Sequence, residues 1–340
     1  MIVETEYLDL PEPLALDCGR VLPNVRIAYE TYGELAQNRD NVLLVCHALS
    51  GDAHAAGETP GALSAGEIET TALGWWDPMI GPGRAFDTDR FHVVSTNLIG
   101  GCRGSTGPGS VDPETGEPYG RSFPQLTVAD LVRAQKAFLD ALGIPRLAAV
   151  AGASLGGMQA LQFATDYPDY VDAVVAIAST KALDTQGVAL NAVARNAIRN
   201  HPEPREGMRI ARQIGHITYL SRESIRDKSG DDRFGVESYL DYQADKFVQR
   251  FDPETYLLFS TALTRFRLDE ERLRDTNARF LLLSFSSDWI YPPSDSEALR
   301  ETIEGAGKEV RHVTLETSYG HDAFLLEAQT QAPHIRSFLG

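Results

Sequence analysis

Residues 150–158 read Val150-Ala151-Gly152-Ala153-Ser154-Leu155-Gly156-Gly157-Met158, with an apolar run before them and a helix-prone segment, 155–167, after them. The pentapeptide 152–156 fits G-x-S-x-G, a serine on a tight turn between a strand and a helix. Such a turn exposes the Ser154 hydroxyl, and the helix N-terminus behind it favours developing negative charge. An ordinary glycine-rich turn has the same pattern, so partners elsewhere in the chain must decide between the two interpretations.

The bulk composition narrows the classes of partner. The chain has 340 residues, 43% of them hydrophobic and 23% charged, and a formal net charge of −17. This charge argues against binding to nucleic acid or to an anionic membrane surface. No apolar run approaches transmembrane length, and the N-terminal residues lack the pattern of a signal peptide, so we expect a cytoplasmic protein. The three cysteines show no metal-ligand spacing, so we expect no metal site.

Alternating strand and helix patterns predict an α/β fold. Buried strands are expected at 41–46, 91–96, 147–151, 171–178, 280–285 and 310–315. Because these runs are apolar at nearly every position, they suit a mostly parallel central sheet flanked by helices. Residues 26–32 fit an earlier antiparallel strand, with another at 14–17. A helix is expected at 127–142, opened by a capping box of Thr127 and Asp130 and ended by Gly143.

Three segments interrupt this alternation. Residues 181–267 are helix-prone and charged, and they lie between two predicted strands. We therefore expect a helical cap (181–267) inserted into a core made of 1–180 and 268–340. The stretches 51–90 and 100–124 predict long loops, which in a compact domain are usually functional.

A serine nucleophile needs a base, and the base needs an orienting carboxylate. Asp288 follows the predicted strand 280–285, and His321 follows the strand 310–315. The chain order Ser, Asp, His and the position at strand ends both fit a nucleophile elbow on an α/β sheet. Asp295 is the nearest competitor of Asp288, but it lies closer to the next helix start. The sequence therefore predicts a triad of Ser154, His321 and Asp288.

An oxyanion hole on this kind of sheet takes two backbone N–H groups. One belongs to the residue after the nucleophile, Leu155. The other comes from the loop after the strand 41–46, where we expect Leu49, with Ala48 as the second choice.

Seven motifs together resemble the homoserine O-acetyltransferase family, the homoserine O-acyltransferases of the α/β-hydrolase fold. They are His47-Ala-Leu-Ser-Gly51, Gly74-Trp-Trp-Asp77, Asn97-Leu-Ile-Gly-Gly-Cys-Arg-Gly-Ser-Thr-Gly-Pro108, Gly116-Glu-Pro-Tyr-Gly120, Gly156-Gly-Met-Gln-Ala-Leu161, Asp288-Trp-Ile-Tyr-Pro-Pro293 and Gly320-His-Asp-Ala-Phe-Leu325. The resemblance covers nearly the whole chain.

The resemblance implies a ping-pong acetyl transfer, as in methionine biosynthesis, from acetyl-CoA through an acyl-enzyme on Ser154 to the side-chain hydroxyl of L-homoserine. It also implies that Asp322 binds the ammonium of homoserine and that Arg212 binds its carboxylate, with Arg209 as the alternative. An arginine can grip a carboxylate through two hydrogen bonds, and an aspartate can pair with an ammonium. No cofactor is implied beyond acyl-CoA as co-substrate, and a homodimer is expected.

Several alternatives remain open at this point. The donor could be succinyl-CoA, the acceptor could be L-serine, or the scaffold could hydrolyse carboxylic esters. A non-catalytic binding module on the same fold is the alternative from a different class. Arg103 and Arg121 are candidates for the CoA phosphates, although a loop arginine is more often simply solvated.

Overall fold

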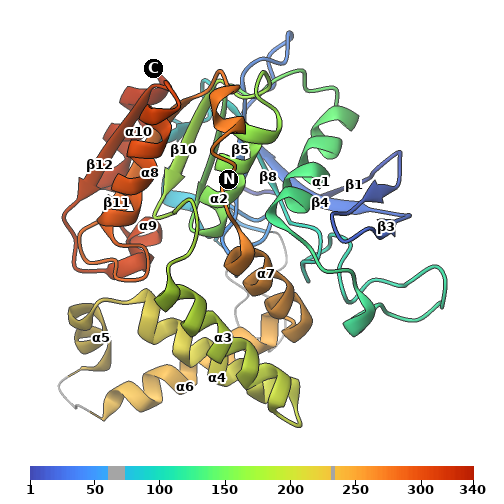
Figure 1. Ribbon diagram of the computed structural model, residues 1–340, viewed down its shortest axis with the longest axis vertical. Helices are drawn as coiled ribbons and strands as arrows, with labels where there is room; N and C mark the ends of the chain where they lie inside the picture. The colour runs from blue at the N-terminus through green and yellow to red at the C-terminus, as the bar shows by residue number, and fades with distance from the viewer. Residues whose placement is uncertain (60–72, 231–233) are drawn as a thin grey trace.

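The structure is a computed structural model that describes residues 1–59, 73–230 and 234–340. At its centre is an eight-stranded sheet with the order β1-β4-β8-β5-β9-β10-β11-β12 (Figure 1). The strands are β1 (Glu6–Asp9), β4 (Arg26–Tyr32), β5 (Val42–Cys46), β8 (His92–Thr96), β9 (Ala149–Ala153), β10 (Ala173–Ile177), β11 (Arg279–Phe285) and β12 (Val310–Leu315). The β1–β4 and β4–β8 pairs are antiparallel and the other neighbours are parallel. The predicted α/β architecture is therefore confirmed.

Each buried strand contributes to two hydrophobic cores because successive side chains point to opposite faces of a sheet. In β5, Val42 and Leu44 pack into the core on one face, and Leu43 and Val45 pack into the core on the other. The first core also takes apolar residues of α1 (Val128–Ala141), α2 (Leu155–Asp166) and α8 (Pro293–Gly305), and the second takes those of α9 (Ala323–Leu326) and α10 (Ala328–Leu339). The sheet is thus covered on both faces, which explains its apolar strands.

Helix α1 begins and ends as its sequence predicts. The Thr127 hydroxyl accepts from the Asp130 N–H, and the Asp130 carboxylate accepts from the Thr127 N–H. Past the helix end, Gly143 has a φ of +69°, a conformation that glycine adopts without steric cost. Gln135, the polar interruption of the apolar stripe, is buried and donates to the Thr96 hydroxyl and the Gln159 side chain.

The N-terminal strands differ from the prediction. The segment expected at 14–17 forms only β2 (Leu14–Ala15), which pairs with β3 (Val21–Leu22) in a separate two-stranded sheet. The first strand of the main sheet is instead β1, which was not predicted. Its side chains are largely exposed because it forms the edge of the sheet, so it lacks the apolar run that marks the inner strands.

Between β10 and β11 the chain leaves the sheet, and its described residues there form five α-helices. They are α3 (Thr185–Asn200), α4 (Pro204–Tyr219), α5 (Arg222–Ser229), α6 (Gly235–Arg250) and α7 (Pro253–Arg265). Helices α3 to α6 group beyond one end of the sheet, with α7 nearer the core (Figure 1). An antiparallel bridge joins Ala182 to Arg267. The division into a core and a cap at 181 and 267 stays a prediction, which this bridge supports.

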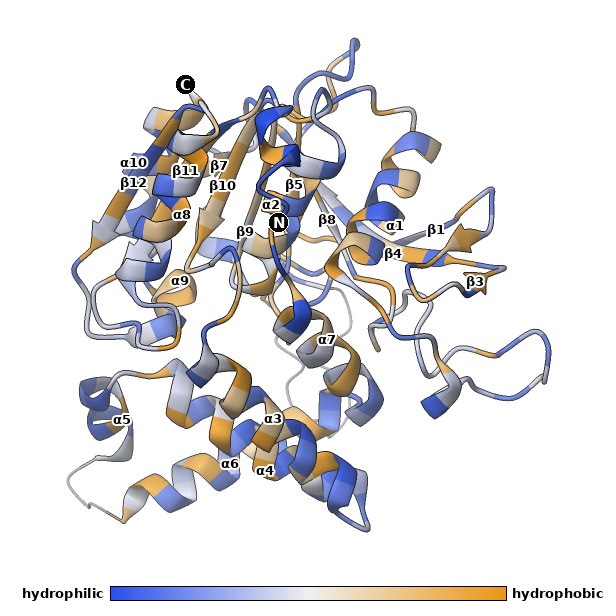
Figure 2. Ribbon diagram, in the orientation of Figure 1, coloured by the Kyte–Doolittle hydropathy of each residue, from blue (hydrophilic) through white to orange (hydrophobic). Residues whose placement is uncertain are grey.

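The two predicted loops contain only short elements. Residues 51–90 include η1 (Asp77–Met79), β6 (Ile80–Gly81) and β7 (Phe86–Asp87), and part of this loop, 60–72, lies outside the described residues. Residues 100–124 include η2 (Gly120–Ser122). A further short element outside both loops, η3 (Arg272–Arg274), lies between α7 and β11. Figure 2 shows mainly hydrophobic central strands, whereas hydrophobic and hydrophilic residues alternate on α3, α4 and α6. Of the helices described, none is long and apolar enough to cross a bilayer.

Candidate active site

Ser154 lies on a strained turn between β9 and α2. Its φ of 56° and ψ of −122° are rare for any residue but glycine, and such strain costs on the order of 1–3 kcal/mol. The turn requires glycine two positions before and two positions after Ser154. A Cβ on Gly156 would lie 2.1 Å from the Cys46 carbonyl oxygen, and one on Gly152 would lie 2.4 Å from the backbone of Gly156. The geometry is that of a nucleophile elbow.

Backbone and side-chain hydrogen bonds hold this turn in place. The Ser154 N–H donates to the Ile177 carbonyl at 2.9 Å, and the Ser179 hydroxyl donates to the Ser154 carbonyl at 3.0 Å. Because Ile177 and Ser179 belong to β10 and the segment after it, the neighbouring strand fixes the elbow.

The predicted carboxylate and base meet at the carboxyl ends of β11 and β12. His321, in η4 (Gly320–Asp322), donates from Nδ1 to Asp288 Oδ2 at 2.7 Å. The other carboxylate oxygen, Asp288 Oδ1, accepts the N–H groups of Ile290 at 3.1 Å and Tyr291 at 3.0 Å. Asp288 and His321 are only 2% and 3% exposed. Asp295 instead lies in the first turn of α8, so the structure brings Asp288 to His321.

Aromatic rings enclose the imidazole of His321. Tyr291 stacks on it with ring centroids 5.0 Å apart and an interplanar angle of 23°, and Phe324 meets it edge-on at 5.5 Å. Among the hydrogen bonds of the described residues, none joins Ser154 Oγ to His321, whose Nδ1 bonds to Asp288. Catalytic hydrogen bonds are often long without substrate and tighten in the reacting complex.

The loop after β5 is shaped by His47, which is completely buried. Burial lowers the pKa of His47, so its imidazole is neutral. Its Nε2 accepts the Leu98 N–H at 3.2 Å, so Nδ1 carries the proton and donates to the Ala48 carbonyl at 2.7 Å. The Gln159 side chain donates to the carbonyls of His47 and Leu155, tying this loop to α2.

The predicted oxyanion donors lie on the two elements that Gln159 connects. Leu49 and Ser154 line one pocket, and Leu155 is the first residue of α2. Within the described part of the chain, neither the Leu49 nor the Leu155 N–H donates to a protein acceptor, so both are available to an oxyanion. The same holds for the Ala48 N–H, so the choice between Leu49 and Ala48 stays a prediction.

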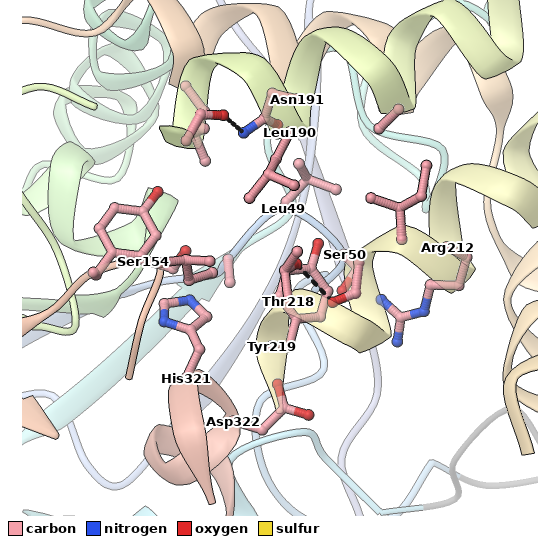
Figure 3. A pocket seen from close by; sticks show the side chains of 18 of the residues that line it. Leu49, Ser50, Ser154, Leu190, Asn191, Arg212, Thr218, Tyr219, His321 and Asp322 are labelled. Atoms are coloured by element: carbon pink, nitrogen blue, oxygen red, sulfur yellow. Dashed lines mark hydrogen bonds between the residues drawn. The ribbon is translucent and has the colours of Figure 1, made fainter. Parts of the chain in front are cut away.

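Both predicted substrate-binding residues line the same pocket as Ser154 and His321, a cavity of about 130 Å³. Figure 3 shows Arg212 and Asp322 approaching it from different elements, α4 and η4. The buried Arg212 Nε has no hydrogen-bond partner among the described residues. Burial raises the pKa of Asp322, while the positive charge of Arg212 acts in the opposite direction. The pocket thus presents a carboxylate and a cation that forms no ion pair with the described residues.

The alternative arginine, Arg209, is engaged elsewhere. It forms ion pairs with Glu206, Asp241 and Asp245 along α4 and α6, and it does not line the pocket. The geometry therefore favours Arg212.

The two arginines considered for the CoA phosphates also have partners. Arg103 pairs with Asp52 at 3.3 Å, and Arg121 pairs with Glu254 at 3.2 Å. Neither lines the pocket that contains Ser154. Their assignment to CoA stays a prediction.

His47, Gln159 and Tyr291 were not predicted to be site residues. Each lies inside a quoted motif, and Tyr291 follows Asp288 by three residues, which was the available signal. Their contacts depend on how separate loops pack, which local sequence does not reveal. Among the described residues, no cluster of three or more His, Cys, Asp or Glu side chains could hold a metal ion.

Comparisons with known proteins show the family to which the chain belongs. Residues 41–328 match the family model of the alpha/beta hydrolase fold. A homoserine O-acetyltransferase of Methanosalsum zhilinae is 46% identical over 356 residues, which cover 96% of this chain and 71% of that protein. A homoserine O-succinyltransferase of Alkalilimnicola ehrlichii is 47% identical over 371 residues, which cover 99% and 95%. The crystal structure of homoserine O-acetyltransferase from Bacillus anthracis superposes with a TM-score of 0.91 at 26% identity, covering 100% of this chain and 98% of that one. The chain therefore belongs to the homoserine O-acyltransferases, the homoserine O-acetyltransferase family of the α/β-hydrolase fold.

Proposed function

We propose that this protein transfers an acetyl group from acetyl-CoA to the side-chain hydroxyl of L-homoserine through an acyl-enzyme on Ser154. The observation that carries the proposal is the buried hydrogen bond of 2.7 Å between Asp288 and His321, in a pocket shared by Ser154, Arg212 and Asp322. A base with an orienting carboxylate activates a serine. The oppositely charged Arg212 and Asp322 can bind the carboxylate and the ammonium of an amino acid that accepts the acyl group.

In the first half-reaction, Ser154 Oγ attacks the thioester carbonyl while its proton passes to His321 Nε2. The N–H groups of Leu155 and Leu49 stabilise the oxyanion. When the tetrahedral intermediate collapses, the carbon–sulfur bond breaks and His321 protonates the departing thiolate of CoA. Asp288 holds the proton on Nδ1 of His321, so that Nε2 is free to act as the base.

In the second half-reaction, the homoserine hydroxyl replaces the thiol. His321 takes its proton, its oxygen attacks the acetyl ester of Ser154, and His321 returns the proton to Ser154 Oγ. Arg212 binds the homoserine carboxylate and Asp322 binds the ammonium. Holding both ends positions the side-chain hydroxyl at the ester, where water would otherwise react.

The lining of the pocket supports acetyl as the acyl group. Apart from the charged pair and His321, its described walls are mostly apolar, with Leu183, Leu190, Leu263, Ile290 and Leu325 among them. A succinyl group would bring a second carboxylate into the pocket, where it would need a cation. The cation described there is Arg212, which the proposal assigns to homoserine.

The exposed surface of the cap supports the expected homodimer, which we also propose. Val193 of α3, Ile210 and Ile217 of α4 and Tyr242 of α6 are exposed apolar or aromatic side chains. These side chains lie on three helices of the expected cap, and exposed apolar side chains favour association where they form a patch. Light scattering coupled to size-exclusion chromatography should give twice the monomer mass, and a monomer at micromolar concentration would rule out this dimer.

A matrix of donors and acceptors tests the proposed activity. Acetyl-CoA and succinyl-CoA are each combined with L-homoserine, L-serine or no acceptor, and CoA release is measured with a thiol reagent. We expect fast release only with acetyl-CoA and homoserine together, and none from S154A. A preference for succinyl-CoA would overturn the acetyl assignment. Release at the same rate without an acceptor would indicate hydrolysis instead.

A further inference from the structure

The guanidinium of Arg212 faces aromatic rings rather than a carboxylate. Its central carbon lies 4.6 Å from the ring centroid of Phe247 on α6 and 5.8 Å from that of Tyr219 on α4. Among the described residues, no carboxylate forms an ion pair with Arg212, and its Nε has no hydrogen-bond partner. A cation over an aromatic ring is attracted by the negative potential of the ring face. Arg212 is therefore held by cation–π contacts.

Arg209, three residues earlier on α4, is held in the opposite way. Helix α6, which packs against α4, supplies the carboxylates of Asp241 and Asp245 to Arg209. The same helix supplies the ring of Phe247 to Arg212. The two helices thus pair one arginine with acids and hold the other without an acidic partner among the described residues.

A cation–π contact leaves the hydrogen-bond donors of Arg212 available. The attraction acts on the positive charge and requires none of the five N–H donors of a guanidinium. An arginine paired with a protein carboxylate would first have to give up that partner to bind the carboxylate of a ligand. Phe247 thus attracts the cation without occupying the donors that a ligand needs.

Asp322 is the carboxylate that competes with the rings for Arg212. Both charged residues line the pocket of Ser154, and Figure 3 draws no hydrogen bond between them. The positive charge of Arg212 nevertheless acts on Asp322, where it opposes the effect of burial on the pKa of this carboxyl. Opposite charges attract strongly where water is largely excluded. Without the ring of Phe247 the guanidinium would move to Asp322, and the resulting ion pair would close the site to a ligand.

We propose that Phe247 is a positioning residue for the acceptor: its ring holds the Arg212 guanidinium apart from Asp322, so that both charges remain open to the two ends of homoserine. The inference rests on the proposed function, which assigns these charges to the carboxylate and the ammonium of that substrate. Homoserine then binds without first breaking an internal ion pair. Phe247 does not line the pocket, so it acts through Arg212.

The surroundings fix the ring of Phe247 in this position. The residue is 1% exposed, and its ring stacks on Phe251 with centroids 4.8 Å apart and an interplanar angle of 23°. Tyr256, which lines the pocket, meets the ring edge-on at 6.3 Å. A ring held on several sides offers Arg212 a stationary surface.

The test changes the charge distribution of the ring and keeps its shape. Phenylalanines with one, two or three fluorine atoms replace Phe247 in the full-length protein, because fluorine withdraws electrons from the ring face and weakens its attraction for a cation. We expect the KM for homoserine to rise in steps, to about fivefold to thirtyfold with three fluorines, as the strength of a desolvated cation–π contact predicts. The ratio kcat/KM for acetyl-CoA reports only the first half-reaction and should stay within about twofold.

A matched control separates this role from packing. Phe338 lies under the guanidinium of Arg279 at 4.3 Å, outside the pocket lining. Trifluorophenylalanine at position 338 should change no kinetic constant. A KM for homoserine that does not respond to fluorination at position 247 would overturn the inference. If the trifluorinated protein does not fold, the singly and doubly fluorinated proteins give the same comparison.

A second control shows whether the effect passes through Arg212. Arg250 also lies over the Phe247 ring, at 5.5 Å, but its Nη1 donates to the Ser50 carbonyl at 2.9 Å and so has a second anchor. In R212A, fluorination at position 247 should therefore leave the KM for homoserine unchanged. An equal response in R212A and in the native background would overturn the inference.

A measurement without substrate keeps the inference separate from the proposed function. Carbon NMR of the Asp322 carboxylate, assigned by its absence from D322N, gives the pH at which this group titrates. In the protein trifluorinated at position 247, Arg212 should pair with Asp322 and lower that pH. An unchanged titration would overturn the inference. A native protein without homoserine-dependent CoA release would contradict the proposed function alone, because the titration requires no homoserine.

Discussion

Replacing Asp288 by asparagine tests whether the carboxylate controls the tautomer of His321. In the native site one carboxylate oxygen accepts from His321 and the other accepts the N–H groups of Ile290 and Tyr291. In D288N the amide oxygen would keep the two backbone donors, which leaves the amide nitrogen facing His321 Nδ1. A donor there favours the tautomer with its proton on Nε2, which cannot accept the serine proton.

The size of the effect follows from the hydrogen bonds exchanged. Restoring the productive tautomer in D288N would break the new bond between the amide and Nδ1 and place two donors against each other. A hydrogen bond to a charged group contributes about 1.5–3 kcal/mol. Losing the native bond to His321 and breaking the new bond from the amide therefore costs roughly 3–6 kcal/mol in total. At about 1.4 kcal/mol per factor of ten, this predicts a 10²- to 10⁴-fold loss in kcat. The protein should still fold, because the substituted side chain has nearly the same shape.

The assay is homoserine-dependent CoA release, with melting temperature as the check on folding. The matched control is Asp295→Asn, the carboxylate that competed with Asp288 in the sequence. Burial and the nearby negative charges of Asp184 and Asp288 raise the pKa of Asp295 to about 6. It accepts no bond from His321, so D295N should keep kcat within about threefold. A folded D288N that loses less than tenfold would refute the role of Asp288.

Three further variants test other parts of the structure. Arg212→Ala should raise the KM for homoserine about 10- to 100-fold in steady-state assays, whereas Arg209→Ala should not, because only Arg212 lines the pocket. Burial lowers the pKa of His216 to about 3, so as pH falls below about 6.5 the unfolded state binds a proton that the folded state excludes, and stability decreases. His216→Phe should remove this loss. Relative to the native protein, the free energy of unfolding of H216F measured with urea should be more favourable by ~2 kcal/mol at about pH 5 than at about pH 8. An equal effect of the substitution at both pH values would contradict this prediction. Gly156→Ala would place a Cβ 2.1 Å from a carbonyl oxygen and should cost about 3 kcal/mol or more, whereas Gly109→Ala, with nothing within 4 Å, should be nearly neutral by the same measurement.

The inner strands and the proposed catalytic residues were predictable because their signals are local. A parallel strand covered on both faces must be apolar at nearly every position, which distinguished β5, β8, β9, β10 and β11. The carboxyl ends of parallel strands meet at one edge of a sheet, so polar residues placed just after them converge. Chain order then assigned Ser154, Asp288 and His321 without knowledge of their distances.

The features that were missed depend on contacts between distant segments. Strand β1 is an exposed edge strand, so its sequence lacks the apolar run of an inner strand. Its place in the sheet is shown only by its pairing with β4. His47 reads as an ordinary loop histidine until Leu98, 51 positions later, donates to its Nε2. Gln159 looks like a polar residue misplaced in a buried helix until the carbonyl groups of His47 and Leu155 are seen to accept from it.

The charges in the pocket explain why an amino acid, rather than water, should be the preferred acceptor. The Nε atom of Arg212 is buried without a hydrogen-bond partner among the described residues, and burial raises the pKa of Asp322, so a ligand that pairs with both groups would offset part of the cost of burying them. The two are near enough to influence each other electrostatically, yet no ion pair between them is found among the described residues. A zwitterion supplies a carboxylate to one and an ammonium to the other, and so stabilises both at once. Water satisfies either group only partly and gains no orientation from the pair, so under the proposed function these two charges would select the acceptor of the second half-reaction.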